Sequence, residues 1–480
     1  MLGNLFSEAG RRHTSRVAVT DPDTELTYGE VLTRATETAD AFHRLRRGDA
    51  PSRVGLVASN SAEYVVCYVA VLLARDVPFL IDSSFGAPEL SLIAEDCGLD
   101  LLVHDAPPDG ESLPVLWEPL AAGCGTLHVG RLSAVADRPK LLDDTEVCRF
   151  TSGTTGKPNC IEFSGAAVSA AAANWAEGTG LGADDRVACF AGLSNGLAFN
   201  TSLLSVFLTG SSLHLSRGLP TGGRIARLIE SVEATRLVGF PALYESVLRR
   251  GLAEDVARRI EVAISSGAPL RPETKEAFAS RTGVVIRNYY GVAEAGPLTF
   301  AQDGEGLDGL GTALPGVTLW AGTPDSPGPI HVVSQSMGSR YLNAPGVFES
   351  RLDAQGRYRT GDEGYLDQGI LQITGRTGRA INVGGRKVDP IEVADALRGA
   401  EGVHEVVVFE DTDQHGDALV AAAVTGEASL DSAAVRAHCL GRLAAFKVPT
   451  RILVLDRLPV NSIGKPSRTA LRELTAQHHR

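Results

Sequence analysis

The sequence predicts an α/β protein. A large N-terminal domain of layered, mostly parallel sheets with helices and a small β subdomain precedes a small, mobile α+β C-terminal domain. Up to about residue 300, short apolar segments alternate with helix-length segments, which is typical of parallel strands covered by helices on both faces. From about residue 310 the pattern changes to short strands and turns, which favours antiparallel pairing. Glycines then interrupt the periodicity at 375–379, ahead of a tail of about a hundred residues.

The first elements follow from apolar spacing. Val31, Ala35 and Phe42 share one face of a helix, whereas the runs that begin at Arg53 and Leu101 are short and apolar, as buried strands are. The expected elements up to residue 150 are helices at 28–45 and 62–73 and strands at 53–58, 77–82 and 101–104.

The same alternation returns between residues 180 and 300. The expected strands are 186–191, 212–215, 237–240, 262–267 and 284–288, and the expected helices are 199–208, 224–232 and 243–248. Ligands of open α/β sheets bind beyond the carboxyl ends of the strands. The segments 265–269 and 288–294, expected to be loops, should therefore lie at a ligand site.

A domain boundary is predicted where the glycines interrupt the pattern. We expect an N-terminal domain at 1–376, a hinge at 377–379 and a mobile C-terminal domain at 380–480. In that tail, Pro390 after Asp389 is typical of a helix start. The other expected elements beyond residue 310 are strands at 329–333, 369–374, 405–409 and 418–424 and helices at 390–397 and 431–446.

Composition excludes several classes of protein. The chain of 480 residues is 44% apolar, enough for at least two domains. Its seven cysteines form no CxxC pair and its histidines form no HExxH motif, so we expect reduced thiols and no dedicated metal cage. Neither an apolar run of membrane-spanning length nor a signal peptide is indicated, and we expect a cytoplasmic protein without membrane contact. The net charge of −13 argues against nucleic-acid binding.

The segment 150–158, Phe-Thr-Ser-Gly-Thr-Thr-Gly-Lys-Pro, predicts a phosphate-binding loop. Its two glycines allow backbone N–H groups to converge, its hydroxyls add donors, and Lys157 adds positive charge. It is not a Walker loop, because two residues separate Gly153 from Gly156 and Pro158 follows Lys157. A polar surface turn is the alternative interpretation.

Three further motifs follow this loop in order. They are Tyr-Gly-Val-Ala-Glu at 290–294, Tyr-Arg-Thr-Gly-Asp at 358–362 and Gly-Lys at 464–465. With the loop, this ordered set resembles the adenylate-forming superfamily of acyl-CoA synthetases, peptide-synthetase adenylation domains and luciferases. The resemblance extends from about Leu26 to Leu471. It implies that a carboxylic acid and ATP form an acyl-adenylate and pyrophosphate, and that the acyl group then passes to a thiol.

The resemblance also implies roles for individual residues. Lys465 and Glu294 would be catalytic, with Lys465 reaching the α-phosphate and Glu294, together with Thr155, holding Mg²⁺. Gly384, Gly385 and Glu392 would face the site during thioester formation. The implied nucleotide-binding residues are Thr151, Ser152, Gly153, Thr154, Thr155, Gly156, Lys157, Gly267, Ala268, Pro269, Asn288, Tyr289, Tyr290, Gly291, Asp362 and Arg376. The implied substrate-pocket residues are Asn195, Phe240, Gly267, Val292 and Ala293.

Some positions depart from the superfamily pattern. Asn159 and Cys160 stand where Lys and Gly are usual, Ala293 replaces a Thr, and Arg379 occupies the hinge position. The implied nucleotide-binding residues are otherwise all present. These departures therefore do not indicate inactivation, although their effect on the reaction rate does not follow from the sequence.

The substrate and the acceptor stay open at this level. Ser194-Asn195 precedes Gly210 with the spacing of a pocket pair in aryl-acid-activating enzymes, although an Asn in a turn before a helix is an equal alternative. No Asp is found where α-amino-acid-activating domains hold the ammonium group, which leaves aryl, β-amino and small aliphatic acids.

Because the chain ends at Arg480 without a carrier domain, we expect an acyl or peptidyl carrier protein with a phosphopantetheine thiol, supplied in trans, in natural-product biosynthesis. An acyl-CoA synthetase using CoA and a non-catalytic nucleotide-sensing protein are the alternatives.

Overall fold

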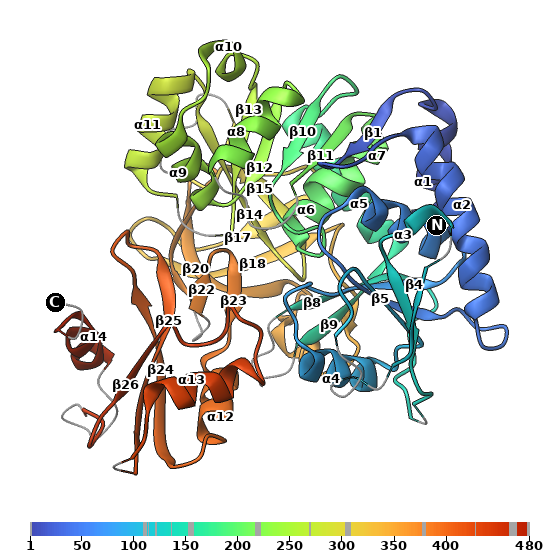
Figure 1. Cartoon of the computed structure of the whole chain (residues 1–480). Coiled ribbons are helices and arrows are strands. Elements are labelled where there is room, and N and C mark those ends of the chain that lie inside the picture. Colours follow the sequence, from blue (N-terminus) through green and yellow to red (C-terminus); the bar gives the residue numbers. More distant parts are fainter. Residues whose placement is uncertain are drawn as a thin grey trace.

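The computed structural model describes residues 2–108, 113, 115–120, 122–135, 137–151, 158–216, 222–267, 270–302, 309–376, 381–427, 429–459 and 468–477 (Figure 1). The segment 152–157, the predicted hinge at 377–379, Ala268, Pro269 and Lys465 lie outside these residues.

One sheet contains an N-terminal hairpin and the strands between residues 186 and 313. Its strands pair in the order β16-β15-β14-β13-β12-β10-β11-β1-β2. Pairing is parallel from β14 to β1 and antiparallel at both ends. The bounds are β1 Val17–Thr20, β2 Glu25–Thr27, β10 Arg186–Cys189, β11 Ser212–Leu215, β12 Arg236–Gly239, β13 Val262–Ser265, β14 Ile286–Val292, β15 Gly296–Phe300 and β16 Thr312–Ala313.

A second sheet is formed mainly by the first 164 residues. Its order is β19-β9-β8-β4-β3-β5-β7-β6, with parallel pairing from β8 to β5 and antiparallel pairing outside that range. The bounds are β3 Arg53–Val57, β4 Val77–Leu80, β5 Leu101–His104, β6 Trp117–Pro119, β7 His128–Arg131, β8 Thr145–Thr151, β9 Asn159–Ser164 and β19 Arg340–Tyr341.

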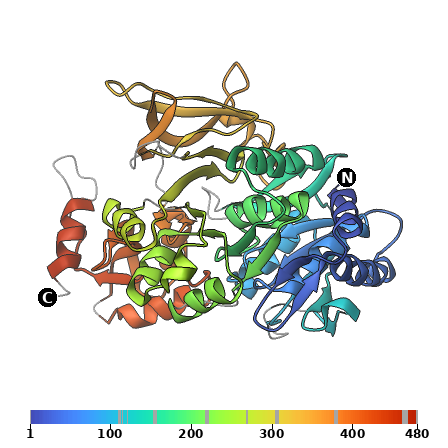
Figure 2. The ribbon, with the colours of Figure 1, turned by 90° about the horizontal axis from the view of Figure 1, so that it is seen from above.

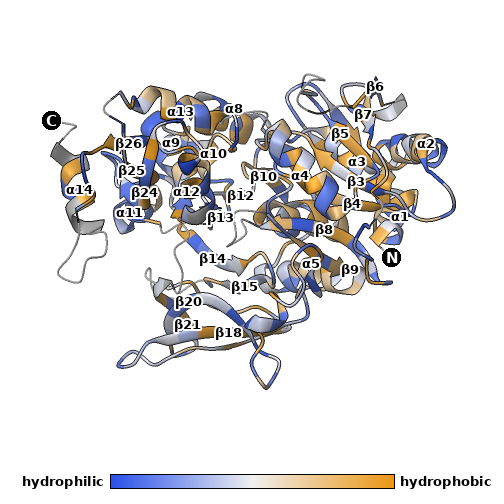
Figure 3. Cartoon of the chain, turned by 90° about the horizontal axis from the view of Figure 1, so that it is seen from below, coloured by the Kyte–Doolittle hydropathy of each residue, from blue (hydrophilic) through white to orange (hydrophobic). Residues whose placement is uncertain are grey.

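Helices α3 and α5 contact strands of both sheets and therefore lie between them. Helix α3 is apolar on nearly every face, which suits a fully covered position (Figure 3). Helix α5 begins at the Ser164 cap and ends at Gly180, which adopts a φ of 64°. The helices of the N-terminal domain are α1 Leu2–Arg12, α2 Tyr28–Leu45, α3 Ala62–Leu73, α4 Ala87–Cys97, α5 Gly165–Thr179, α6 Gly196–Ala198, α7 Ser205–Thr209, α8 Gly222–Ser231, α9 Pro241–Arg250, α10 Glu254–Ala257 and α11 Pro272–Thr282, with the π-helix η2 Phe199–Leu204 and the 3₁₀-helices η1 Ala122–Cys124 and η3 Glu349–Arg351.

An antiparallel subdomain lies to one side of these layers (Figure 2). Its strands pair in the order β17-β18-β20-β21. They are β17 Val317–Trp320, β18 Gly328–Ser334, β20 Tyr358–Asp367 and β21 Ile370–Arg376. The antiparallel subdomain predicted beyond residue 310 is therefore confirmed.

The residues from 381 onward form the α+β part. A short hairpin, β22-β23, precedes a sheet of order β24-β25-β26. The elements are β22 Ile381–Val383, β23 Arg386–Val388, β24 Val403–Thr412, β25 Ala418–Gly426, β26 Arg451–Val454, α12 Pro390–Arg398, α13 Ser432–Leu440 and α14 Arg468–Gln477. The predicted α/β class, with a large N-terminal and a small C-terminal domain, is confirmed.

Several expected elements differ in extent or type, and three of the differences matter most. Strand β14 continues through Val292, so 288–292 is strand rather than loop, because β15 supplies an antiparallel partner. Helix α13 ends at Leu440 instead of 446, where Gly441 follows. The helix expected at 199–208 begins as a π-helix. The described helices include none that is both long and apolar enough to cross a membrane.

Lys447 joins the two domains through a buried ion cluster. Its Nζ donates to Glu89 Oε1 of α4 at 2.8 Å and to Glu392 Oε1 of α12 at 2.7 Å. The Lys447 side chain is 1% exposed and lies 4.9 Å from the Phe85 ring centroid. Burial raises the pKa of Glu392 to about 7, against the opposing charge of Lys447. The cluster thus ties the C-terminal domain to α4 in one orientation.

Replacing Lys447 with alanine should leave two buried carboxylates without their cation. We expect the free energy of unfolding to fall by about 3–5 kcal/mol, measured by urea denaturation, because the cost is that of an uncompensated buried charge. Lys140→Ala is the matched control, since its ion pair with Asp143 is exposed and spans 4.0 Å. Equal stability of the two variants would show that the cluster does not hold the interface.

Candidate functional site

Tyr290 and Asp362, which belong to two motifs far apart in the sequence, meet in the structure. The Tyr290 hydroxyl donates to Asp362 Oδ2 at 2.8 Å, and both residues are buried. Tyr290 comes from β14, and Asp362 from β20, where it pairs with Arg376 of β21. The structure therefore brings together an aromatic ring and a carboxylate, the groups that the resemblance assigns to adenine and ribose.

Neighbouring residues of β14 point elsewhere. Asn288 donates through Nδ2 to the Gly309 carbonyl at 2.9 Å, so its amide holds the following loop. Tyr289 packs edge-on against Trp175 in the core, with ring centroids 5.0 Å apart. Because successive side chains of a strand alternate, Tyr289 does not share the face of Tyr290, and its contact with the nucleotide stays a prediction.

Glu294 is buried just beyond β14, and its Oε1 accepts a hydrogen bond from the Tyr341 hydroxyl at 2.7 Å. Burial alone would raise the pKa of Glu294. The charges of Lys387 and Arg351, with the Tyr341 hydrogen bond, outweigh it and lower the pKa below its ordinary value. An ionised carboxylate is the kind of hard oxygen ligand that Mg²⁺ prefers, so Glu294 fits the predicted role. No group of three or more metal-ligating side chains occurs within the described ranges.

A glycine turn of the C-terminal domain packs against the N-terminal domain at this site. Gly267 and Gly385 have φ values of +82° and +84°, and a Cβ at either would lie 2.8 or 2.5 Å from a carbon of the Phe240 ring. Asn382 of β22 also donates to the Gly267 carbonyl. Both glycines therefore permit a close approach that any side chain would block. The predicted pocket residue Phe240 is covered by the β22-β23 hairpin.

Among the predicted substrate-pocket residues, Val292 ends β14 and Ala293 follows it, whereas Asn195 precedes α6. Asn195 Oδ1 accepts from the Leu197 amide at 2.9 Å and so caps α6, which favours the turn interpretation for that oxygen. The Ala293 carbonyl accepts a hydrogen bond from Arg149 Nη2 at 2.8 Å. A buried arginine thus contacts the backbone of the predicted substrate-pocket residue Ala293.

The sequence interpretation missed Arg149 and Lys387. An arginine beside the apolar residues Val147, Cys148 and Phe150 of β8 was the available signal for Arg149, whereas nothing local to β23 indicated that Lys387 lies near Glu294. Thr151 ends β8, and Arg376 ends β21 beside Asp362. Gly291 lies in β14, and the remaining predicted nucleotide residues, 152–157, 268 and 269, are outside the described ranges.

Family models match most of the chain. The model for AMP-binding enzymes matches residues 6–341, and the model for the C-terminal domain of AMP-binding enzymes matches residues 392–465.

Curated relatives are identical to the chain at about a quarter of the matched positions. A long-chain-fatty-acid–CoA ligase of Mycobacterium tuberculosis is 27% identical over 478 residues, which cover 94% of this chain and 93% of that protein. Tyrocidine synthase 2 of Brevibacillus parabrevis is 25% identical over 511 residues, and the match covers 98% of this chain but 14% of that protein.

A solved structure has the same fold. The o-succinylbenzoate CoA synthetase of Bacillus subtilis superposes with a TM-score of 0.85 at 22% identity, over 98% of each chain. At this identity the likeness concerns the fold alone.

If Asp362 holds the ribose, Asp362→Ala should weaken ATP binding measured by titration calorimetry. The expected loss is about 1.5–3 kcal/mol, the range for a charged hydrogen-bond partner. Tyr290→Phe should weaken binding less, because the ring remains and only the 2.8 Å hydrogen bond to Asp362 is lost. Asp353→Ala is the control, since that carboxylate pairs with Arg357 in the same part of the chain. ATP affinity that matches the control would remove Asp362 from the nucleotide site.

Proposed function

The chain belongs to the family of AMP-binding enzymes, and we propose that it activates a carboxylic acid with ATP and then transfers the acyl group to a carrier protein. Adenylate-forming, AMP-forming ligase activity follows from the family and its relatives. We propose in addition that the acceptor is the phosphopantetheine thiol of a separate carrier protein and that the reaction serves natural-product biosynthesis. The observation that supports adenylate formation is the hydrogen bond between the motif residues Tyr290 and Asp362, with the buried Glu294 just beyond the same strand, in a chain matched by both family models.

The first half-reaction brings two anions together, the acid and the triphosphate. In the proposed site, Tyr290 stacks on adenine and Asp362 accepts hydrogen bonds from the ribose hydroxyls. Glu294 is held ionised and would hold Mg²⁺, which would neutralise phosphate charge when bound. The loop 152–157 supplies N–H and hydroxyl donors to the leaving pyrophosphate. Donors fixed in advance lower the barrier because they need not reorganise as charge develops.

The orientation of the C-terminal domain supports a second half-reaction. The Gly384-Gly385 turn packs on Phe240 and Gly267, and Lys387 lies near Glu294. The resemblance assigns this face of the tail to thioester formation. Lys465 would occupy the site in the other orientation, during adenylation, so the two steps would use two faces of one mobile domain.

CoA is the alternative acceptor. It is favoured by the fatty-acid–CoA ligase, whose whole length the chain nearly spans. The peptide-synthetase relative favours a carrier protein, although the chain spans a small part of that protein.

Pyrophosphate exchange with a panel of carboxylic acids tests the proposed activity. We expect ATP-dependent exchange that requires an acid and Mg²⁺, followed by a thioester when a thiol acceptor is added. Phosphopantetheinylated carrier protein and CoA should be compared at equal concentrations, with the carrier protein giving the faster transfer. Faster transfer to CoA would establish the alternative. Nucleotide binding without exchange for any acid would favour a sensing protein.

Lys465→Ala should separate the two half-reactions. Adenylation should fall roughly 10²–10³-fold or more, as when a transition-state donor is lost, while transfer from pre-formed acyl-adenylate stays nearly unchanged. Pyrophosphate exchange and single-turnover transfer should be measured on the same variant. Equal loss in both steps with a lower melting temperature would indicate a structural lysine. No loss in either step would indicate a solvated one.

A further inference from the structure

One short segment of the N-terminal domain, residues 82–89, meets two cations of the C-terminal domain. Lys447 Nζ donates to Glu89 Oε1 at 2.8 Å within the buried ion cluster. Arg386 Nε, from the β22-β23 hairpin, lies 3.6 Å from Asp82 Oδ2. The N-terminal side of this contact therefore presents carboxylates, and the C-terminal side presents the matching cations.

Aromatic rings accompany both cations. The Phe85 ring centroid lies 4.9 Å from Lys447 Nζ, and the Phe446 ring centroid lies 4.8 Å from the guanidinium carbon of Arg386. Such contacts strengthen when the cation is removed from water. The Lys447 and Glu89 side chains are buried, whereas those of the Arg386 pair are partly exposed. The Lys447 end should therefore contribute more to the contact than the Arg386 end.

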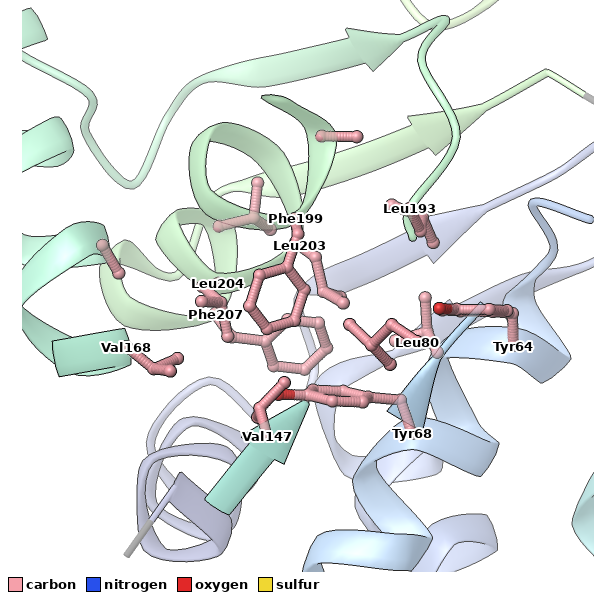
Figure 4. Close-up of a cluster of buried hydrophobic side chains, with 14 of the residues drawn as sticks. Tyr64, Tyr68, Leu80, Val147, Val168, Leu193, Phe199, Leu203, Leu204 and Phe207 are labelled. Carbon is pink, nitrogen blue, oxygen red and sulfur yellow. The ribbon is translucent and has the colours of Figure 1, made fainter. Parts of the chain in front are cut away.

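The segment 82–89 is anchored in the N-terminal domain at both of its ends. It follows β4, which pairs with β3 on one side and β8 on the other. Leu80, the last residue of β4, belongs to the buried cluster that Figure 4 shows, together with Tyr68 of α3. At its other end the segment continues into α4, where Leu90 and Ile93 are buried. The N-terminal domain thus fixes the positions of the carboxylates by itself.

The two sides of the contact can part without leaving a charge unpartnered. Lys447 Nζ also donates to Glu392 Oε1 at 2.7 Å, and both of these residues belong to the C-terminal domain. Glu89 Oε2 accepts a hydrogen bond from the Gly86 amide at 3.2 Å, within the N-terminal domain. Since each side keeps a partner of its own, the contact suits a position that the domain can take up and leave.

We propose that residues 82–89 form a latch that favours one orientation of the C-terminal domain, the one in which Gly384-Gly385 faces the site. Glu89 and Asp82 are positioning residues in this latch, because they act through the two cations and not on the reacting atoms. This inference rests on the proposed function and concerns the balance between its two half-reactions. A contact made in only one of two orientations shifts their populations by its free energy. The latch therefore favours thiol transfer over adenylation.

Glu89→Gln tests the latch with little change of shape. The amide removes the negative charge, yet Gln still fits the third position of the capping box that starts α4. Adenylation and transfer from pre-formed acyl-adenylate should both be measured as single-turnover rates, with the thiol acceptor that the unaltered enzyme uses best. Because each rate scales with the population of its orientation, the transfer-to-adenylation ratio should fall about 10-fold, as expected for one charged hydrogen bond. An unchanged or higher ratio would overturn the inference.

Asp185→Asn is the matched control. Its 2.9 Å ion pair with Arg236 is also buried but lies wholly within the N-terminal domain. This variant should lower the melting temperature and leave the ratio unchanged, so a comparable fall in its ratio would also overturn the latch. Asp82→Asn should lower the ratio only about 2- to 5-fold, because its pair with Arg386 is partly exposed. If Glu89→Gln does not fold, Asp82→Asn carries the test, and an unchanged ratio there contradicts the latch.

Hydrogen exchange gives a readout that is independent of turnover. In the observed orientation the β22-β23 hairpin, residues 381–388, covers Phe240. Exchange of its backbone amides, followed by mass spectrometry, should be faster in Glu89→Gln than in the unaltered enzyme. It should not be faster in Asp185→Asn. Equal exchange in the unaltered enzyme and Glu89→Gln would show that the contact does not hold the domain.

The proposed function fails in a distinguishable way. In that case the unaltered enzyme forms no adenylate with any carboxylic acid. If instead both half-reactions proceed and Glu89→Gln leaves their ratio unchanged, the proposed function stands and the latch is wrong.

Discussion

Strand β14 pairs with a parallel strand at its start and with an antiparallel strand at its end. The positions of the candidate site residues depend on this change of pairing. Its first residues pair in parallel with β13, and its last four pair antiparallel with β15. The antiparallel extension carries the strand beyond the edge of the parallel sheet. Alternation then directs Tyr290 toward Asp362 of the β subdomain and Tyr289 into the core beside Trp175. A shift of one residue in this pairing would exchange the two faces and separate the motif residues.

The C-terminal domain completes the site through contacts that depend on its orientation. Lys387 contributes to the low pKa of Glu294, and Gly385 lies against Phe240. Neither contact could persist if the domain rotated away, and the Lys447 cluster would then expose its charges to water. Because buried ion pairs add little net stability compared with apolar packing, such a cluster suits the mobile C-terminal domain that the sequence predicts. Stability and catalysis are thus coupled through one set of contacts.

Local sequence patterns predicted the elements whose bounds depend on interactions within the element itself. Helices α2 and α3 begin and end where apolar periodicity and the Thr27 and Ser61 caps place them. The patterns could not predict that β14 continues through Val292, because its partner β15 is a tertiary neighbour. The ordered motifs led to Tyr290, Asp362 and Glu294, which the structure brings to one region. Periodicity alone indicated only a strand end and turns there. Arg149 was missed because its burial arises from the stacking of two sheets, which no single strand encodes.

Arg149 is a buried cation that links β8 to the Ala293 carbonyl just beyond β14. Strand β8 faces an apolar interior, where valine or isoleucine would pack without a desolvation cost. The chain as a whole carries a net charge of −13, yet Arg149, Lys387 and Arg351 all lie close to Glu294 or its neighbour Ala293. Cations gathered in an acidic protein raise the local concentration of anions. A site that binds a triphosphate and an acid together is favoured by such a field.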